Sequence, residues 1–307
     1  MKTVSLIIFS TLVFVIAGCQ KPGPIEVVDP QLHSQSLELD NSTFSSPEFF
    51  GIEGVDSGSV YPATRLSPAG NQMSTAQFLV TGVQYDALLE HHEASLARVI
   101  MFDRTQMIVI GTDTIFRTID AGRIRFDGLE MFKIPTKYYS HSAGFDTVIG
   151  LQYMLLSKDG IGGRGFRYFG NHLYQWESSG SPQLSAFSIN GISSRELHVT
   201  SPTPRDVIVA SRNLPVMWEG GASAVHIIIS NLQPGGTPKP LFHMKVNTNR
   251  GSIIIPSTVL QILPRDRNAF LFSFISDLTT MTQISGYPGN VVLQTISIHN
   301  LVLQVAR

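Results

Sequence analysis

Residues 269–276 read AFLFSFIS, and Phe270, Phe272 and Phe274 occupy every second position of this stretch. Successive side chains of a β-strand point to opposite faces of a sheet, so this alternation places the three phenylalanines on one face. A strand with one strongly apolar face must bury that face against another layer. The stretch therefore predicts a core strand of an all-β domain.

A second alternating stretch lies upstream, where Leu214, Val216 and Trp218 again occupy every second position. Two sheets that pack face to face bury such faces between them, so we expect the two stretches to share one core. Further short apolar runs separated by turn residues continue to the C-terminus, and residues 256–263 are typical of a single helical turn or a loop. The pattern predicts a β-sandwich domain over residues 200–307.

This C-terminal unit resembles a known family of sandwiches. A tryptophan that ends the second strand, in a unit of about a hundred residues without a cysteine pair, resembles the fibronectin type III family. The resemblance covers residues 205–307 and depends on pattern rather than on a specific motif. Immunoglobulin-like domains usually carry a cysteine pair and fit less well. The resemblance implies support or recognition more often than catalysis.

The sequence predicts a second β-rich domain over residues 49–199. Residues 200–204 read TSPTP, and the two prolines favour an extended segment that does not pair within a sheet. Before this segment, short apolar or alternating runs are separated by Gly, Asp, Ser and Pro, which is typical of strands and turns. Residues 85–97, YDALLEHHEASLA, leave open whether they form a short helix or continue the strands.

The N-terminus reads as a secretory leader. Lys2 supplies a positive charge, an apolar run follows over residues 4–15, and small residues precede Cys19. Residues 16–19, IAGC, resemble the lipobox of bacterial lipoproteins. The resemblance implies a signal peptide over residues 1–18 and acylation of Cys19, which anchors the chain to a membrane. Gln20, where an Asp would favour retention in the inner membrane, implies the outer membrane of the cell envelope.

Residues 19–48 are rich in Pro, Ser and acidic side chains, and their apolar residues are scattered rather than periodic. We expect a flexible tether between the anchor and the folded part.

Composition excludes several classes of partner and site. The formal net charge of the chain is −1, so it lacks the basic surface that nucleic acids attract. Its one cysteine is Cys19, and with that thiol acylated neither a disulfide nor a thiolate metal site can form.

Two short motifs suggest chemistry, but neither stands in the setting that its chemistry needs. Residues 160–165, GIGGRG, match GxGxxG but run into an aromatic strand instead of a helix, so they predict a turn. Residues 90–93, EHHE, hold possible metal ligands, but adjacent histidines point apart in a helix or a strand, so a solvated turn is favoured. No nucleophile motif such as GxSxG stands in a convincing setting. We therefore expect no catalytic residue, cofactor or metal ligand that the sequence alone can identify.

One strand of the first domain offers a ligand-binding surface. His172, Tyr174 and Trp176 alternate and would share one strand face, and tyrosine and tryptophan supply large contact areas with a polar edge. The competing interpretation places Tyr174 and Trp176 in the core, since a sandwich buries one face of each strand.

The sequence thus predicts a lipid-anchored envelope lipoprotein with two β-sandwich-like domains. As a non-catalytic binding or structural module it would have a glycan or an envelope protein as partner. The alternative is a surface hydrolase of glycans or peptides with a dispersed active site in the first domain.

Overall fold

The computed structural model describes residues 76–307 apart from 112, 141–144, 159–165, 233–237 and 247–250. The described residues all belong to one compact unit. The elements in chain order are β1 (Ala76–Asp86), β2 (His91–Ile100), β3 (Phe102–Ile110), β4 (Asp113–Thr118), β5 (Ile124–Phe126), β6 (Leu129–Glu130), β7 (Phe132–Ser140), β8 (Phe145–Lys158), β9 (Leu173–Ser178), β10 (Phe187–Ile192), β11 (Arg195–Ser201), β12 (Val207–Val209), β13 (Leu214–Gly221), β14 (Val225–Asn231), β15 (Lys239–Val246), β16 (Ser252–Ile255), α2 (Ser257–Gln261), β17 (Ala269–Thr282) and β18 (Val291–Ala306). The expected all-β class is confirmed.

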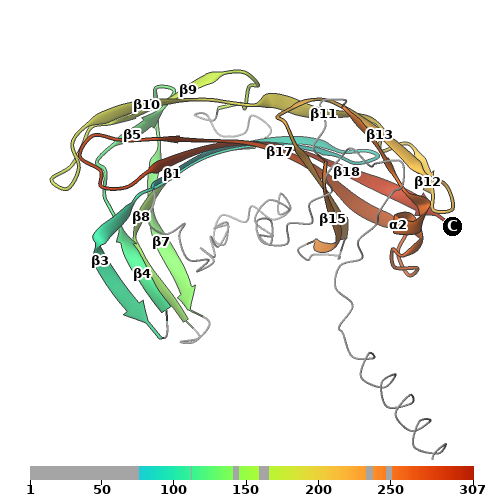
Figure 1. Cartoon of the computed structure of the whole chain (residues 1–307), viewed down its shortest axis with the longest axis horizontal. Coiled ribbons are helices and arrows are strands. Elements are labelled where there is room, and N and C mark those ends of the chain that lie inside the picture. The colour runs from blue at the N-terminus through green and yellow to red at the C-terminus, as the bar shows by residue number, and fades with distance from the viewer. Residues whose placement is uncertain (1–75, 112, 141–144, 159–165, 233–237, 247–250) are drawn as a thin grey trace, which may run out of the picture. The chain divides into compact units, whose positions relative to one another are not determined.

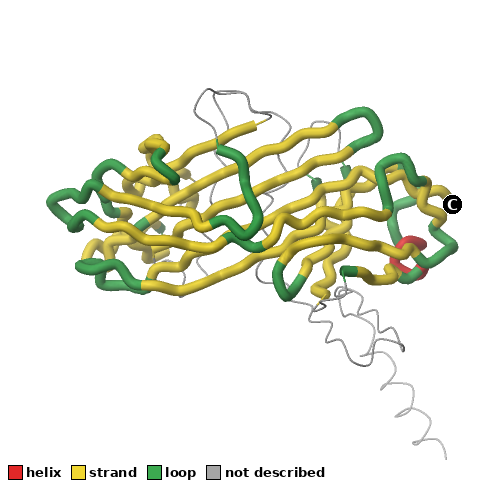
Figure 2. Tube along the Cα trace, turned by 90° about the horizontal axis from the view of Figure 1, so that it is seen from above, coloured by secondary structure: helices red, strands yellow, loops and turns green. Residues whose placement is uncertain are grey.

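One large sheet organises the described residues. Its strand order is β15-β14-β17-β18-β1-β2-β8-β7, and β12 pairs with the end of β18. The strands run side by side in Figures 1 and 2. β1 is parallel to β18, from Ala76 opposite Val291 to Asp86 opposite Leu301, and its other neighbour β2 is antiparallel to it.

The pairing of β1 with β18 joins the two ranges that the sequence divides at residues 200–204. β1 comes from the first range and β18 from the second, and the division falls at the end of β11. The boundary therefore does not separate two sheets, which corrects the expected pair of independent domains. A parallel pairing between distant segments leaves no local sequence signal, whereas the two prolines mark only a local break.

A second layer packs on one face of the large sheet, which we call the front face. This layer consists of two smaller sheets, β10-β9-β5-β6 and β11-β13-β16, and Figure 1 shows it above β1, β17 and β18. Hydroxyls of β18 bind the covering layer directly, because Ser194 N–H donates to Thr295 Oγ1 and Leu197 N–H donates to Ser297 Oγ. The two layers therefore form a sandwich in which one layer is the continuous large sheet.

The core follows the alternation in the sequence. Phe270, Phe272 and Phe274 are all 0% exposed, and β13 alternates buried and exposed residues from Leu214 to Trp218. This confirms both predicted core strands. A further cluster fills the space between the large sheet and β5, β9 and β10, and includes Phe78 and Trp176.

Residues 85–97 form the β1–β2 hairpin, not a helix. Gln84 lies opposite Glu93 and Asp86 opposite His91 across this pair. β2 also pairs with β8 on its other side, and this pairing outweighs the modest helix propensity of the segment. The expected helical turn near residue 256 is α2. Among the described residues, no helix is long and apolar enough to cross a membrane.

Candidate functional site

A polar cleft opens where the end of β1 meets β11 and β13. Its volume is about 950 Å³, and its walls combine charged side chains with glycines. The described residues that line it are Gln84, Gly170, Asn171, Arg195, Glu196, His198, Trp218, Glu219, Gly220, Gly221, Ala222 and Gly251. A cleft of this size with several convergent polar groups is typical of a binding site for a small molecule or an oligomer.

Three glycines that line the cleft lie very close to the backbone of β11 or β13. A Cβ at Gly220, whose φ is +77°, would lie 1.8 Å from the carbonyl oxygen of Glu196. A Cβ at Gly251 would lie 2.5 Å from the Trp218 oxygen, and one at Gly170 would lie 2.4 Å from the Glu196 nitrogen. A Cβ atom does not approach another heavy atom closer than about 3.0 Å, so a larger residue at any of these positions would push the cleft walls apart.

Gln84 connects the large sheet to the covering layer inside the cleft. Its Nε2 donates to Glu196 Oε1 at 2.6 Å, and its Oε1 lies 3.4 Å from His198 Nδ1. These two contacts orient the amide, and they are consistent with a proton on His198 Nδ1. His198 also lies directly opposite Glu219 across the β11–β13 pair. The cleft therefore presents two carboxylates, an imidazole and an amide from three strands.

A buried histidine, His299 of β18, lies next to these cleft residues. The side chain of His299 is 1% exposed, its Nε2 donates to Asp86 Oδ2 at 2.8 Å, and its Nδ1 accepts the Val199 N–H at 2.8 Å. With Nδ1 accepting, the proton of the neutral ring lies on Nε2. Burial lowers the pKa of His299, although Asp86 acts in the opposite direction. Because both ring nitrogens are used, His299 holds strands together and is not available as a base.

Asp86 receives a second partner from the neighbouring strand. His91 Nδ1 contacts Asp86 Oδ1, while His299 contacts Oδ2. Burial alone would raise the pKa of Asp86, but the hydrogen bonds from His91 and His299 hold this pKa below its usual value. The ring of His299 also stacks on His198 with 5.0 Å between centroids, which connects the buried pair to the cleft wall.

The lining chemistry favours recognition. Among the described lining residues there is no Ser, Thr, Cys or Lys, so the groups able to react are the carboxylates of Glu196 and Glu219 and the ring of His198. Carboxylates and His198 accept hydrogen bonds, while Arg195 and Asn171 donate them. Such a set suits a ligand that carries many groups able both to donate and to accept.

The strand face of His172, Tyr174 and Trp176 is largely core. Tyr174 is 1% and Trp176 is 0% exposed, and both belong to the cluster around Phe78. The Tyr174 ring stacks on Phe126 at 5.0 Å, and Trp176 meets Phe78 edge to face at 5.7 Å. The flat ligand-facing surface is therefore not formed, because the sandwich buries this side of β9.

His172, the third member of that set, is part-exposed. Its Nε2 lies 2.9 Å from Asp127 Oδ2, and Asp127 Oδ1 accepts the Gln175 N–H at 2.8 Å. This pair ties the β5–β6 turn to β9, so the His172 ring has a structural role.

Other sequence candidates have mixed outcomes. His91 and His92 point to different partners, Asp86 and the Tyr85 ring respectively, as expected for neighbours on a strand. No cluster of metal-ligating side chains is present among the described residues. Cys19 and residues 160–165 lie outside the described residues.

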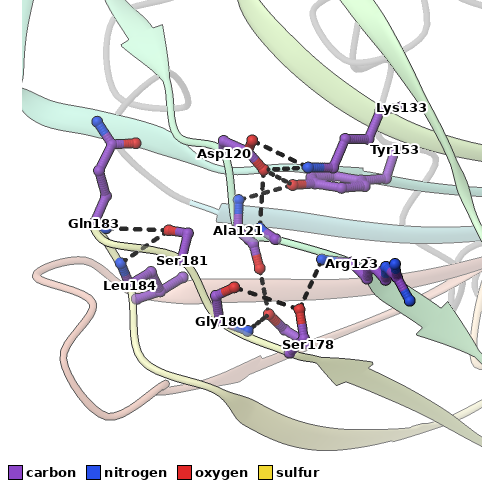
Figure 3. A network of polar contacts seen from close by, with 12 residues as sticks. Asp120, Ala121, Arg123, Lys133, Tyr153, Ser178, Gly180, Ser181, Gln183 and Leu184 are labelled. Atoms are coloured by element: carbon purple, nitrogen blue, oxygen red, sulfur yellow. Dashed lines mark hydrogen bonds and ion pairs between the residues drawn. The ribbon is translucent and has the colours of Figure 1, made fainter.

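A second polar network lies far from the cleft in sequence (Figure 3). Tyr153 O–H donates to Asp120 Oδ1 at 2.7 Å and accepts the Ala121 N–H at 2.7 Å, while Lys133 Nζ donates to Asp120 at 2.8 Å. Burial alone would raise the pKa of Asp120, but Lys133 and Tyr153 hold it below its usual value. Burial also raises the pKa of Tyr153, so its hydroxyl stays protonated. The network fixes the segment between β4 and β5 and is structural.

No local pattern of residues indicates the cleft. Gln84 and Glu196 are 112 positions apart, and Gln84 and His198 are 114 apart. The nearest motif is EHHE at residues 90–93, which predicts a solvated turn and does not indicate that His91 is a partner of Asp86. Dispersed polar residues become a site only through the pairing of β1 with β18 and the packing of β11 above it.

Neither a scan against protein-family models nor a search of curated proteins found a match. A search of solved structures matched fibronectin(III)-like modules of Clostridium thermocellum CbhA at 8% identity and a TM-score of 0.21, covering 76% of this chain and 96% of that chain. A TM-score this low does not establish a shared fold or function.

Proposed function

We propose that the protein is a lipid-anchored envelope lipoprotein that binds a glycan chain in the polar cleft. The observation that carries the proposal is the cleft itself, where Gln84, Glu196 and His198 are oriented by mutual contacts between two layers. Preorganised polar groups need little reordering when a ligand binds.

Charge and hydrogen-bonding capacity favour a sugar over other ligands. Two carboxylates and one guanidinium line the cleft, so neither a strongly anionic nor a strongly cationic ligand is matched. Sugar hydroxyls both donate and accept, which fits acceptors on Glu196 and Glu219 beside donors on Arg195 and Asn171. Trp218 also lines the cleft but is only 5% exposed, so the polar groups supply most of the contact surface.

Membrane attachment is the second part of the proposal. It is supported by the leader and by the lipobox-like residues 16–19, and Gln20 favours the outer membrane. Two or three acyl chains give stable anchoring, each buried methylene contributing about 0.8 kcal/mol. Cys19→Ala is expected to leave the protein unprocessed or to release it from the detergent phase. Normal processing and partitioning of this variant would contradict the anchor.

Binding is tested with the purified protein on a panel of envelope polysaccharides. Glu196→Gln keeps the size of the side chain but removes the charge that faces Gln84, and we expect affinity to fall about tenfold or more, as for loss of one charge-assisted hydrogen bond. Glu130→Gln on β6 is the matched control and should bind as wild type. Equal retention of both variants would contradict binding in the cleft.

A glycan hydrolase is the second candidate, because Glu196 and Glu219 place two carboxylates in one cleft. Paired carboxylates are the usual catalytic groups of glycosidases. The two functions differ in turnover. Release of new reducing ends from a retained polysaccharide, abolished by Glu219→Gln, would favour the hydrolase, and retention without cleavage favours the binding module.

A further inference from the structure

Two charged side chains of opposite sign, Arg195 and Glu219, line the polar cleft. Arg195 comes from β11 and Glu219 from β13, and these strands pair side by side in the covering layer (Figure 1). Both side chains are exposed to solvent. A ligand that enters the cleft must therefore meet both charges.

An irregularity in β11 turns Arg195 toward the cleft. Arg195 lies opposite Gly221. His198, three positions later in β11, lies opposite Glu219, which is only two positions from Gly221. In a regular strand Arg195 would share the buried side of Leu197, but Arg195 is exposed. Extra residues of this kind re-aim side chains and are frequent next to active sites.

Neither charge has a partner within the described part of the chain. No ion pair or hydrogen bond joins the Arg195 guanidinium or the Glu219 carboxylate to another described residue. The residue directly opposite Arg195 is Gly221, which has no side chain that could pair with it. The other carboxylate of the cleft, on Glu196, already accepts a hydrogen bond from Gln84. One positive and one negative group are therefore left for a ligand.

The charge of the ligand decides how well these two groups are satisfied. A ligand that displaces water from a charged group without replacing its hydrogen bonds incurs a desolvation penalty. A neutral glycan would leave both groups without a partner. A glycan that carries only carboxylates would match Arg195 but be repelled by Glu219, and a glycan that carries only amines would have the reverse mismatch. A ligand with both kinds of group matches both residues.

The spacing of the two residues limits how far apart the ligand's charges can be. Arg195 and Glu219 are one strand apart and two positions out of register, which places their Cα atoms about 8 Å apart. The matching groups of the ligand must therefore lie on the same sugar or on neighbouring sugars.

We infer that the glycan bound in the cleft is zwitterionic, with a carboxylate that pairs with Arg195 and an ammonium that pairs with Glu219. This rests on the proposed function, because it names the class of glycan that the same cleft binds. Guanidinium and carboxylate groups form paired, charge-assisted hydrogen bonds, which gives the Arg195 contact its selectivity. A peptide with adjacent acidic and basic side chains has the same charges but lacks the hydroxyls that suit Asn171 and Glu196.

The inference is tested by calorimetric titration of the purified protein with one oligosaccharide in four charge states. Heparosan oligosaccharides, which alternate glucuronic acid with N-acetylglucosamine, carry carboxylates only. N-deacetylation adds amines and makes the zwitterion, carboxyl reduction of that product leaves amines only, and carboxyl reduction of the parent gives a neutral form. The zwitterion should bind about tenfold or more tightly than each of the other three.

Two substitutions assign each charge of the ligand to its residue. Arg195→Gln should weaken the zwitterion about tenfold and leave the amine-only form unchanged, whereas Glu219→Gln should weaken the zwitterion and leave the carboxylate-only form unchanged. Both residues are exposed, so both variants should fold as wild type. Arg125→Gln and Glu130→Gln, on exposed positions of β5 and β6, are the matched controls and should change none of these affinities.

The outcomes separate this inference from the proposed function. A neutral or singly charged form that binds as tightly as the zwitterion, or a polysaccharide of the envelope panel that is retained without free amino or carboxyl groups, would overturn the inference and leave glycan binding in place. N-acetylation and carboxyl reduction of any retained polysaccharide should each weaken its retention about tenfold or more. Failure of every glycan to bind, with or without binding of a Lys-Glu dipeptide, would overturn the proposed function and this inference together.

Discussion

His299 of β18 donates its Nε2–H to the Asp86 carboxylate of β1 at 2.8 Å, at the end of the parallel pair that joins the two halves of the sequence. The same ring accepts the Val199 N–H of β11. One neutral imidazole therefore ties together two strands of the large sheet and the covering layer beside the cleft. The protonation state of this ring should control stability.

The pH dependence of unfolding follows from the lowered pKa of His299. As pH falls below about 6.5, His299 becomes protonated in the unfolded chain but stays neutral in the folded chain. The free energy of unfolding therefore falls until pH passes the folded pKa of His299. The slope is at most about 1.4 kcal/mol per pH unit for one proton. Urea unfolding between pH 8 and 5, approximate limits of the histidine range, should show this loss in wild type and a smaller loss in His299→Gln. Identical pH profiles would refute the assignment.

Gly220→Ala should damage the cleft wall. The residue has φ +77°, and an added Cβ would lie 1.8 Å from the Glu196 oxygen. Gly128→Ala is a matched control, because its φ is +78° but nothing lies within 4 Å of the added Cβ. The control should cost about 1–2 kcal/mol for the left-handed backbone alone. Thermal unfolding should show a larger loss for Gly220→Ala, with weakened glycan retention, and equal losses would argue against close packing there.

Trp176 should behave as a core residue. Trp176→Ala is expected to lower the free energy of unfolding by about 3–5 kcal/mol, as for other buried aromatic truncations. Gln175→Ala, an exposed neighbour on β9, should cost less than about 1 kcal/mol. Chemical denaturation of both variants measures the difference. A Trp176→Ala variant as stable as wild type would contradict the core assignment and favour a ligand-binding role for this strand face.

Separating the chain at residue 200 should prevent folding of either part. β1 loses its parallel partner β18, and β11 loses the β18 side chains that accept its N–H groups. Each fragment alone should show no cooperative transition by circular dichroism, and mixing the two should restore one. A cooperative transition in a fragment of residues 200–307 alone would restore the two-domain interpretation.

Local patterns predicted local structure well. The alternation of Phe270, Phe272 and Phe274 specifies a strand and its buried face, because burial on a pleated strand has a period of two. The prolines at residues 202 and 204 likewise end β11, but they say nothing about which strands meet elsewhere. The domain boundary was misplaced for this reason.

The cleft could not be predicted because its chemistry is spread over distant strands. Glu196 is one acidic residue among many until Gln84 is brought to it by the sheet. The aromatic alternation at Tyr174 and Trp176 is compatible with a ligand surface and, more readily, with a core, and only the second layer decides between them. Periodicity identifies a face but not what lies against that face.

The most direct test of glycan binding uses the two tryptophans of the chain. Both side chains are buried, but Trp218 borders the cleft whereas Trp176 lies in the core near Phe78. We predict that, in nitrogen-15 indole NMR spectra with signals assigned through Trp218→Phe, titration with a retained envelope glycan shifts the Trp218 signal and leaves that of Trp176 in place. A glycan that binds without moving the Trp218 signal would contradict the proposed site.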